Sequence, residues 1–281
     1  MNDHLLKMME FRAFSFETDP EYVVDMHRAQ EILEGSWFDR EDTLKMYNKM
    51  VLRAKGSSWL LTVAKAVVGY ADAITCNEGG FITRWRLHPD FRHPKVAKIL
   101  FNGLKTIGRK RDWNSMTLYA DNAEVAQDIE SAGIPRDRCF QWISLGEVEP
   151  LTGALVDYCP MSLTQALDQN FLPFLGCPLP PSFLITRSFL AYEYGAFSFR
   201  KPDFYRIPVG DILYTALYDG REWFIFRKEK NNADSESIKR LLSAIASFSP
   251  GRILLSEKAI EKADMVPASD ETFWDFFIPE V

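Results

Sequence analysis

Basic side chains gather at one turn of the sequence, between an apolar segment that ends at Leu87 and an amphipathic segment that begins at Val96. Arg92, His93 and Lys95 lie in this turn. Where a strand enters a helix, exposed backbone amides and the positive end of the helix dipole favour an anion. The turn is therefore a candidate cradle for a pyrophosphate. A plain strand–turn–helix with solvated basic residues is the alternative.

Few other residues suggest acid–base or nucleophilic chemistry. Tyr119 and Asp121 end a later apolar segment and are candidate catalytic residues, although a strand aromatic and a strand-end cap explain them too. Glu78 lies in a glycine turn, where a solvated carboxylate is the alternative. Cys139 is a candidate nucleophile, but no histidine is paired with it in the sequence, so a buried thiol is the simpler interpretation.

The sequence gives no support to metal chemistry or to a membrane span. The four cysteines form no CxxC pair and the four histidines form no HExxH motif, so we expect no metal site. Free thiols favour a reducing, cytoplasmic setting. The first residues, MNDHLLKMMEF, lack the apolar core of a signal peptide, and no apolar run reaches about 18 residues.

Length and charge narrow the class of protein. The chain has 281 residues, of which 47% are hydrophobic and 26% are charged, enough for one large or two modest globular domains. The net charge is -6 and no basic stripe dominates, so we expect no nucleic-acid partner.

The elements around the basic turn follow from apolar spacing and turn residues. Strands are predicted at 9–16, 58–64, 67–75, 81–87, 115–121 and 140–145, with a hairpin between the second and third. Helices are predicted at about 19–33, 40–53, 96–111 and 122–132. Antiparallel strands then flank one strand–helix–strand unit, which is typical of a mixed sheet.

The second half repeats part of this order. A proline-rich connector over 148–182 is expected to pack on the first domain, with a short helix that starts at a capping box of Ser162 and Gln165. Aromatic strands are predicted over 183–199, then a hairpin across Asp219 and Gly220, a helix over 234–248 and a final strand at 273–278. The shared order suggests a diverged internal duplication.

The first half resembles the GNAT superfamily of acetyl-CoA-dependent N-acetyltransferases. The stretch LHPDFR from Leu87 to Arg92 is similar to the family's strand end, and RHPKVA from Arg92 to Ala97 falls on its R-x-x-G-x-[G/A] loop. The stretch from Asn122 to Ile134 has the spacing of its N-x-x-A…G-F segment. The resemblance covers roughly residues 9–147. It implies an α/β fold of the α+β mixed-sheet type, with a GNAT-like domain over 1–147, a connector over 148–182 and a smaller α/β domain over 183–281, for which a degenerate second GNAT-like copy is one interpretation.

The resemblance implies acetyl-CoA as the cofactor and direct transfer of an acetyl group to a small-molecule or protein amine. The pantetheine arm would lie in the gap between splayed strands and the pyrophosphate on the loop. The cofactor-binding residues that it implies are Trp85, Leu87, Arg92, His93, Pro94, Lys95, Val96, Ala97 and Asn122. The acceptor pocket would involve Glu31, Glu34, Trp37 and Phe38, which an ordinary helix end explains equally well.

Three departures from the family's pattern affect this chemistry. Lys95 replaces the first loop glycine, which adds bulk but also a charge that could reach the pyrophosphate. Pro94 has no amide hydrogen to donate. Ile129 stands where the family's tyrosine acid falls, and it cannot protonate a leaving thiolate.

Two functions therefore stay open beside a purely structural role. The first is an N-acetyltransferase with one cofactor site within residues 80–135. The second is a catalytically silent GNAT-like protein that binds CoA or a protein partner. In the second half, Asp234 and Glu236 would repel a phosphate from the helix that they open, so we expect no cofactor there. That half would instead wall the acceptor site or support a homodimer.

Overall fold

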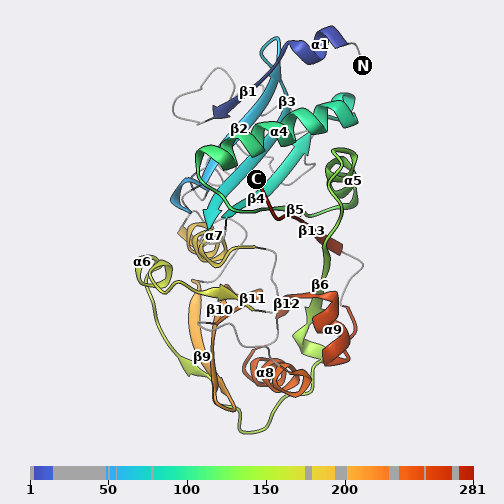
Figure 1. Cartoon of the computed structure of the whole chain (residues 1–281). Coiled ribbons are helices and arrows are strands. Elements are labelled where there is room, and N and C mark those ends of the chain that lie inside the picture. Colours follow the sequence, from blue (N-terminus) through green and yellow to red (C-terminus); the bar gives the residue numbers. More distant parts are fainter. Residues whose placement is uncertain are drawn as a thin grey trace. The chain divides into compact units, whose positions relative to one another are not determined.

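The computed structural model describes residues 3–14, 49, 51–54, 56–76, 79–174, 179–193, 201–227, 234–249, 251–267 and 272–281. The helix expected at 19–33 lies outside these residues, as do most of the helix expected at 40–53, Glu78 and the four acceptor-pocket candidates Glu31, Glu34, Trp37 and Phe38. Contacts divide the chain into two compact units, Met1–Asp137 with Phe273–Val281, and Arg138–Thr272 (Figure 1).

The elements of the first unit are α1 (Asp3–Lys7), β1 (Met9–Phe14), β2 (Gly56–Val63), β3 (Ala66–Cys76), β4 (Gly79–Leu87), α4 (Pro94–Lys110), β5 (Met116–Ala120), α5 (Ala123–Ser131) and β13 (Thr272–Ile278). Those of the second unit are β6 (Arg138–Ser144), β7 (Asp157–Tyr158), α6 (Leu163–Leu167), β8 (Leu172–Pro173), α7 (Pro181–Glu193), β9 (Asp203–Val209), β10 (Ile212–Tyr218), β11 (Glu222–Arg227), α8 (Ser235–Phe248), β12 (Arg252–Ser256) and α9 (Glu257–Ala263).

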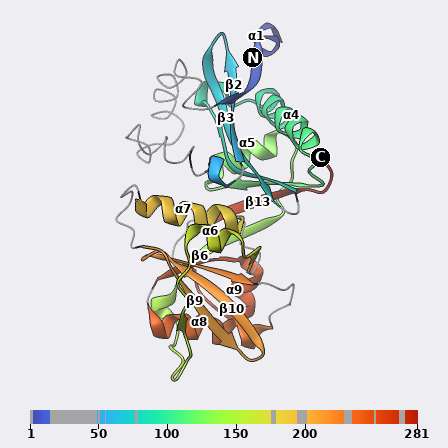
Figure 2. The same ribbon diagram turned by 90° about the vertical axis from the view of Figure 1, so that its left-hand side faces the viewer.

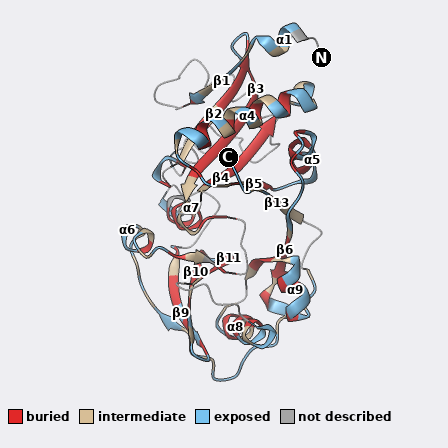
Figure 3. Ribbon diagram, viewed as in Figure 1, coloured by how far each residue is buried: buried red, intermediate tan, exposed pale blue. Residues whose placement is uncertain are grey.

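The first unit is built on a mixed sheet with the strand order β1-β2-β3-β4-β5-β13. Successive strands from β1 to β4 are antiparallel, β5 is parallel to β4, and β13 is antiparallel to β5. The apolar faces of α4 and α5 share one core with β4 and β5, and the strands β2 to β4 are almost wholly buried (Figure 3). The predicted mixed sheet is confirmed.

Local signals explain the elements that hold the site. Ala64 and Lys65 connect β2 to β3 with φ angles of 48° and 72°, the left-handed conformation that a two-residue hairpin turn requires. Pro94 occupies the first turn of α4, where its missing amide hydrogen has little effect on the helix. Arg109 and Lys110 lie in the last turn, where positive charge favours the helix dipole.

The second unit repeats the order strand, strand, strand, helix, strand, helix. Its sheet has the order β7-β9-β10-β11-β12-β6, with β11 and β12 parallel. The strands lie between α7 on one side and α8 on the other (Figure 2). The hairpin across Asp219 and Gly220 is confirmed, and Asp219 accepts hydrogen bonds from the amides of Arg221 and Glu222 at 3.1 and 2.8 Å.

The last strand of each repeat belongs to the other unit. β6 follows α5 in the sequence, yet it pairs with β12 along Phe140–Ser144. β13 follows α9, yet it pairs with β5 along Trp274–Ile278. The contact units therefore differ from the expected ranges of 1–147 and 183–281 at both of these strands, while those ranges stay a prediction about domains.

Two predictions for the middle of the chain are wrong. Aromatic strands were expected over 183–199, but residues 181–193 form the helix α7, with Phe183, Leu184 and Ile185 all buried. A continuous apolar run does not distinguish a strand from a buried helix, and Pro181 suits a helix start. The connector, expected to pack on the first domain, instead pairs with the second unit, since β7 pairs with β9 and β8 with β11. The capping box at Ser162 and Gln165 is confirmed.

Among the helices that the structure describes, we find none whose length and apolar content would let it cross a bilayer.

Candidate functional site

The site begins where β4 and β5 part, which we call the first divergence. The two strands pair only at their starts, at Gly80 with Met116, Phe81 with Thr117 and Ile82 with Leu118. From Arg84 to Leu87, β4 pairs with β3 alone among the described strands, and Thr83 lies at a register shift of that ladder. Within the described part of the chain, one edge of β4 therefore has no strand partner over these residues.

The direction of the backbone groups on this edge follows from the ladder with β3. The amide of His88 donates to the carbonyl of Val68 at 2.9 Å. Since bonded groups alternate along an antiparallel pair, the amides and carbonyls of Leu87 and Trp85 point away from β3. The Trp85 carbonyl accepts a hydrogen bond from Nη1 of Arg86 at 2.8 Å. The two residues expected to contact pantetheine thus face the first divergence with their main chains.

An ion pair spans the first divergence near its wide end. Nη2 of Arg86 lies 2.5 Å from Oδ2 of Asp121, and the two side chains are 7% and 39% exposed. Asn122 donates from Nδ2 to the other oxygen of Asp121 at 3.1 Å. Asp121 therefore lies at the site but is held by two neighbours.

The basic turn satisfies its own amides. The amide of Lys95 donates to Nδ1 of His93 at 3.1 Å, and the amides of Val96 and Ala97 donate to the His93 carbonyl at 2.8 and 3.0 Å. Pro94 has no amide hydrogen. His93 thus caps α4 in the position where an anion would accept the same hydrogen bonds, so an anion at this turn would first meet the side chains of the turn.

Two carboxylates of α5 hold Arg92. Its Nη1 lies 2.7 Å from Oε2 of Glu124, and its Nε lies 3.5 Å from Oδ2 of Asp128. Burial raises the pKa of Asp128 to about 6, which the charge of Glu124 assists and the charges of Arg92 and Arg86 oppose. We call Glu124 and Asp128 the carboxylate clamp.

The remaining candidates have structural partners. The ring of Tyr119 is buried and stacks on Phe273 of β13 with 5.8 Å between centroids. Asn122 caps α5, since its Oδ1 accepts from the amide of Val125 at 2.9 Å. Ile129 is fully buried in the core, so the structure offers no side chain there that could donate a proton. Cys139 lies half-buried on β6 in the second unit and forms no disulfide bond among the described residues.

Sequence reasoning missed Asp128 and a buried polar cluster on β2 and β3. Asp128 interrupts the apolar stripe of α5, and that interruption was the available signal. In the cluster, Asp72 accepts hydrogen bonds of 2.5 Å from both Ser58 and Tyr70. Burial, followed by the charge of Asp72, raises the pKa of Tyr70 well above its ordinary value. A serine, a tyrosine and an aspartate that alternate along two paired strands gave a weak signal in the sequence.

Comparisons with known proteins find similarity in structure alone. Neither a protein-family model nor a curated protein matches the sequence. A proposed acetyltransferase from Pyrococcus horikoshii is 13% identical, with a TM-score of 0.60 over 98% of this chain and 92% of that chain. A GCN5-related N-acetyltransferase from Kribbella flavida is 12% identical, with a TM-score of 0.55 over 99% of this chain and 72% of that chain.

A third similar structure has two copies of the fold in one chain. It is a tandem GNAT protein from the clavulanic acid biosynthesis pathway, 12% identical, with a TM-score of 0.50 over 96% of this chain and 97% of that chain. At such low identities the likeness defines the fold. This chain therefore has the fold of GCN5-related N-acetyltransferases, as a divergent example.

Proposed function

We propose that the first unit binds acetyl-CoA at the first divergence and transfers the acetyl group directly to an amine. The observation that carries this proposal is the edge of β4 from Thr83 to Leu87, which β5 leaves uncovered. A main-chain edge of this kind can pair with the amides of an extended ligand. The fold and the basic turn that follows the edge support the same choice.

Each part of the proposed site has a separate task. The backbones of Trp85 and Leu87 would bind the pantetheine arm, and the side chains of Arg92 and Lys95 would bind the pyrophosphate by charge. The bound cofactor supplies an acyl group activated as a thioester. Arg92 can reach a phosphate only by leaving the carboxylate clamp, so we expect binding to open these ion pairs.

The acceptor amine must lose a proton before it attacks a thioester. Of the two catalytic candidates, Asp121 has the more exposed side chain, whereas the ring of Tyr119 is buried against Phe273. We therefore propose that the carboxylate of Asp121 accepts this proton from the amine, while Arg86 holds the carboxylate in place. Asp121→Asn should lower kcat more than it weakens acetyl-CoA binding.

Calorimetric titration with acetyl-CoA, CoA and dephospho-CoA tests the proposal. We expect saturable one-to-one binding, and Lys95→Glu should weaken it by about 100-fold because a carboxylate would face the phosphates. Lys258→Glu, on an exposed part of α9, is the matched control and should change nothing. Unchanged affinity of Lys95→Glu would remove Lys95 from the site. A lack of binding at millimolar ligand would refute the proposal.

A silent GNAT-like protein that binds CoA or a protein partner is the second candidate. The burial of Ile129 and the pairing of Asp121 with Arg86 favour it, because neither position presents an unengaged acid or base. Acetyl-CoA binding without transfer to any member of a panel of small amines and lysine peptides would favour this candidate over an enzyme.

A further inference from the structure

The second unit has a strand divergence of its own, between β11 and β12. These parallel strands pair only at Glu222 with Arg252 and at Trp223 with Ile253. We call this place the second divergence. Beyond it, the backbone of β11 from Phe224 to Arg227 loses β12 as a partner, and buried backbone groups without partners are unfavourable.

The chain itself supplies the missing partner. β8 pairs antiparallel with β11 at the second divergence, with Leu172 opposite Arg227 and Pro173 opposite Phe226. The amide of Phe174 donates to the carbonyl of Ile225 at 3.1 Å. Residues 171–174, which we call the inserted segment, therefore cover the edge of β11 with main chain.

Two aromatic side chains fix the inserted segment on β11. Phe171 stacks on Phe226 with 5.2 Å between ring centroids, and Phe174 meets Tyr214 edge to face at 5.0 Å. Phe171 packs on Phe226, and Phe174 lies opposite the neighbouring residue, Ile225. Since neighbouring residues of a strand point to opposite faces, the two rings lie on opposite faces of the sheet. Both phenylalanines of the segment are buried.

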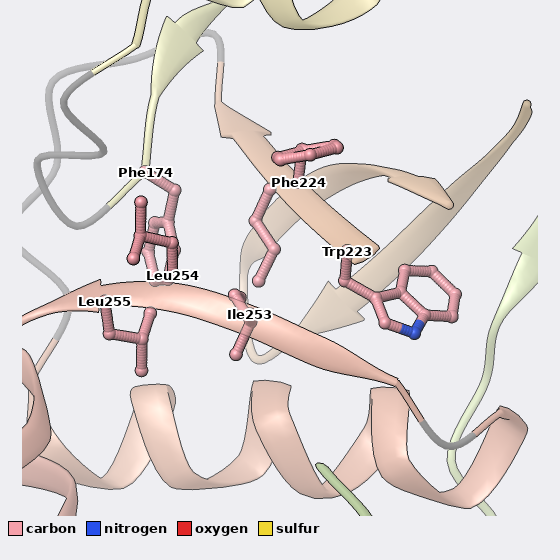
Figure 4. A pocket seen from close by; sticks show the side chains of 7 residues that line it. Phe174, Trp223, Phe224, Ile253, Leu254 and Leu255 are labelled. Atoms are coloured by element: carbon pink, nitrogen blue, oxygen red, sulfur yellow. The ribbon is translucent and has the colours of Figure 1, made fainter. Parts of the chain in front are cut away.

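The inserted segment leaves almost no space at the second divergence. Figure 4 shows Phe174 reaching toward Leu254 and Leu255 of β12. The cavity between them measures about 10 Å³, which is roughly the room that one water molecule needs. A pantetheine arm could enter only if the segment left.

The helix start beside the second divergence also disfavours a phosphate. Asp234 caps α8 by accepting a hydrogen bond from the amide of Ser237 at 2.7 Å, and this bond holds the pKa of Asp234 below its ordinary value. Glu236 adds a second carboxylate in the first turn. Negative charge thus already occupies the positive end of the helix dipole.

We propose that the inserted segment is a resident intramolecular ligand of the second unit, which occupies the strand edge by β-strand addition and keeps acyl-CoA out. The occupation of the edge does not depend on the proposed function, whereas the exclusion of acyl-CoA is meaningful only beside a working first divergence. One chain would accordingly bind one cofactor.

Hydrogen exchange of the full chain, read by mass spectrometry with and without saturating acetyl-CoA, tests this proposal. Peptides covering 83–97 should become protected by the cofactor, while those covering 170–174, 222–227 and 252–256 should not change. Protection of 222–227 together with faster exchange of 170–174 would overturn the proposal, because the cofactor would then displace the segment. An unprotected segment in the free protein would overturn it as well.

A pair of variants isolates the main-chain bond. Phe174→Ala removes the ring and keeps the amide donor, whereas Phe174→Pro removes both. We expect peptides covering 222–227 to exchange about tenfold faster in Phe174→Pro than in Phe174→Ala, since only the former leaves the Ile225 carbonyl without its donor. Equal rates would show that the bond does not hold the segment. This comparison stands even if acetyl-CoA binds nowhere, an outcome that would refute the proposed function alone.

Discussion

In both divergences, two parallel strands pair only at their starts, but the strand edge that is left open has a different kind of partner in each. In the first unit, the edge of β4 beyond Ile82 has a side-chain partner, Arg86, on the Trp85 carbonyl. In the second unit, the edge of β11 beyond Trp223 has a main-chain partner, the inserted segment. A sheet edge that the chain covers with main chain is a structural element, whereas one that side chains reach can exchange partners with a ligand.

The paired residues at the base of the two divergences also differ. In the first unit the paired residues Gly80 and Met116 bring small and apolar groups together. In the second unit the paired residues Glu222 and Arg252 form an ion pair of 2.6 Å, and Arg187 adds another of 2.6 Å to the same carboxylate. The second divergence is therefore held together by ion pairs at its base and by the inserted segment beyond it. Both features favour a single, fixed structure.

The largest effect is expected at the base of the first divergence. A side chain at Gly80 would overlap the ring of Trp113, so Gly80→Ala should destabilise the chain by about 3 kcal/mol. The corresponding contact in the second unit is looser, because a Cβ at Gly251 would lie 2.8 Å from Cδ1 of Trp223. Gly251→Ala should destabilise by roughly 1–2 kcal/mol. Urea unfolding of both variants checks the order, and equal losses would contradict it.

Charge at the second divergence gives the next effect. The side chain of Glu222 is 4% exposed; burial alone would raise its pKa, but Arg187 and Arg252 outweigh burial and hold the pKa below its ordinary value. Glu222→Gln should destabilise by about 2–3 kcal/mol, since two arginines lose a charged acceptor. A depressed pKa stabilises the fold above the ordinary pKa of glutamate, and this part is lost as pH falls below that value. Urea unfolding at pH 7 and pH 4 should show a smaller loss at pH 4.

The sequence predicted the parts of the fold that local signals determine. The hairpin between β2 and β3, whose turn lies one residue earlier than predicted, the helix after Pro94 and the short helix α5 each depend on residues a few positions apart. The exchange of β6 and β13 between the units could not be predicted, because the apolar pattern of a strand does not determine which strand it pairs with. The helix α7 was missed for a related reason, since its apolar residues show no clear period.

The sequence located the basic turn before α4, but it did not predict the contacts of the side chains in that turn. Charge and turn chemistry located Arg92, His93 and Lys95, and the structure leaves their role in binding a cofactor as a prediction. That Arg92 lies against the carboxylate clamp, and that His93 takes the Lys95 amide, depends on rotamers and on how α4 packs beside α5. No spacing in the sequence determines such contacts.

The contribution of the buried Asp128, on α5, to the stability of the fold should depend on pH in the opposite way to that of Glu222. With its pKa raised to about 6, Asp128 keeps a proton in the folded state that the unfolded chain has already lost. Stability should therefore fall as pH rises from about 4 to about 6 and stay level above. Asp128→Asn removes this dependence and should stabilise the first unit by up to about 2 kcal/mol at pH 7.5 relative to pH 4. Urea unfolding at the two pH values checks it, and a gain of equal size at both would contradict it.

The smallest effect concerns the release of Arg92 from the carboxylate clamp. Glu124 is exposed, so its ion pair with Arg92 contributes less than about 1 kcal/mol, yet a phosphate of the proposed cofactor would have to compete with it. Glu124→Gln should therefore raise acetyl-CoA affinity by about threefold, with a weaker gain at high salt because exposed charges are screened. Glu130→Gln is the matched control, since Glu130 lies on the same helix and pairs with Arg136 instead. Calorimetry at low and high salt measures both variants. If Glu124→Gln bound acetyl-CoA more weakly than the control, the clamp would be assisting the ligand, and the first divergence would resemble the second in having its partners fixed before any cofactor arrives.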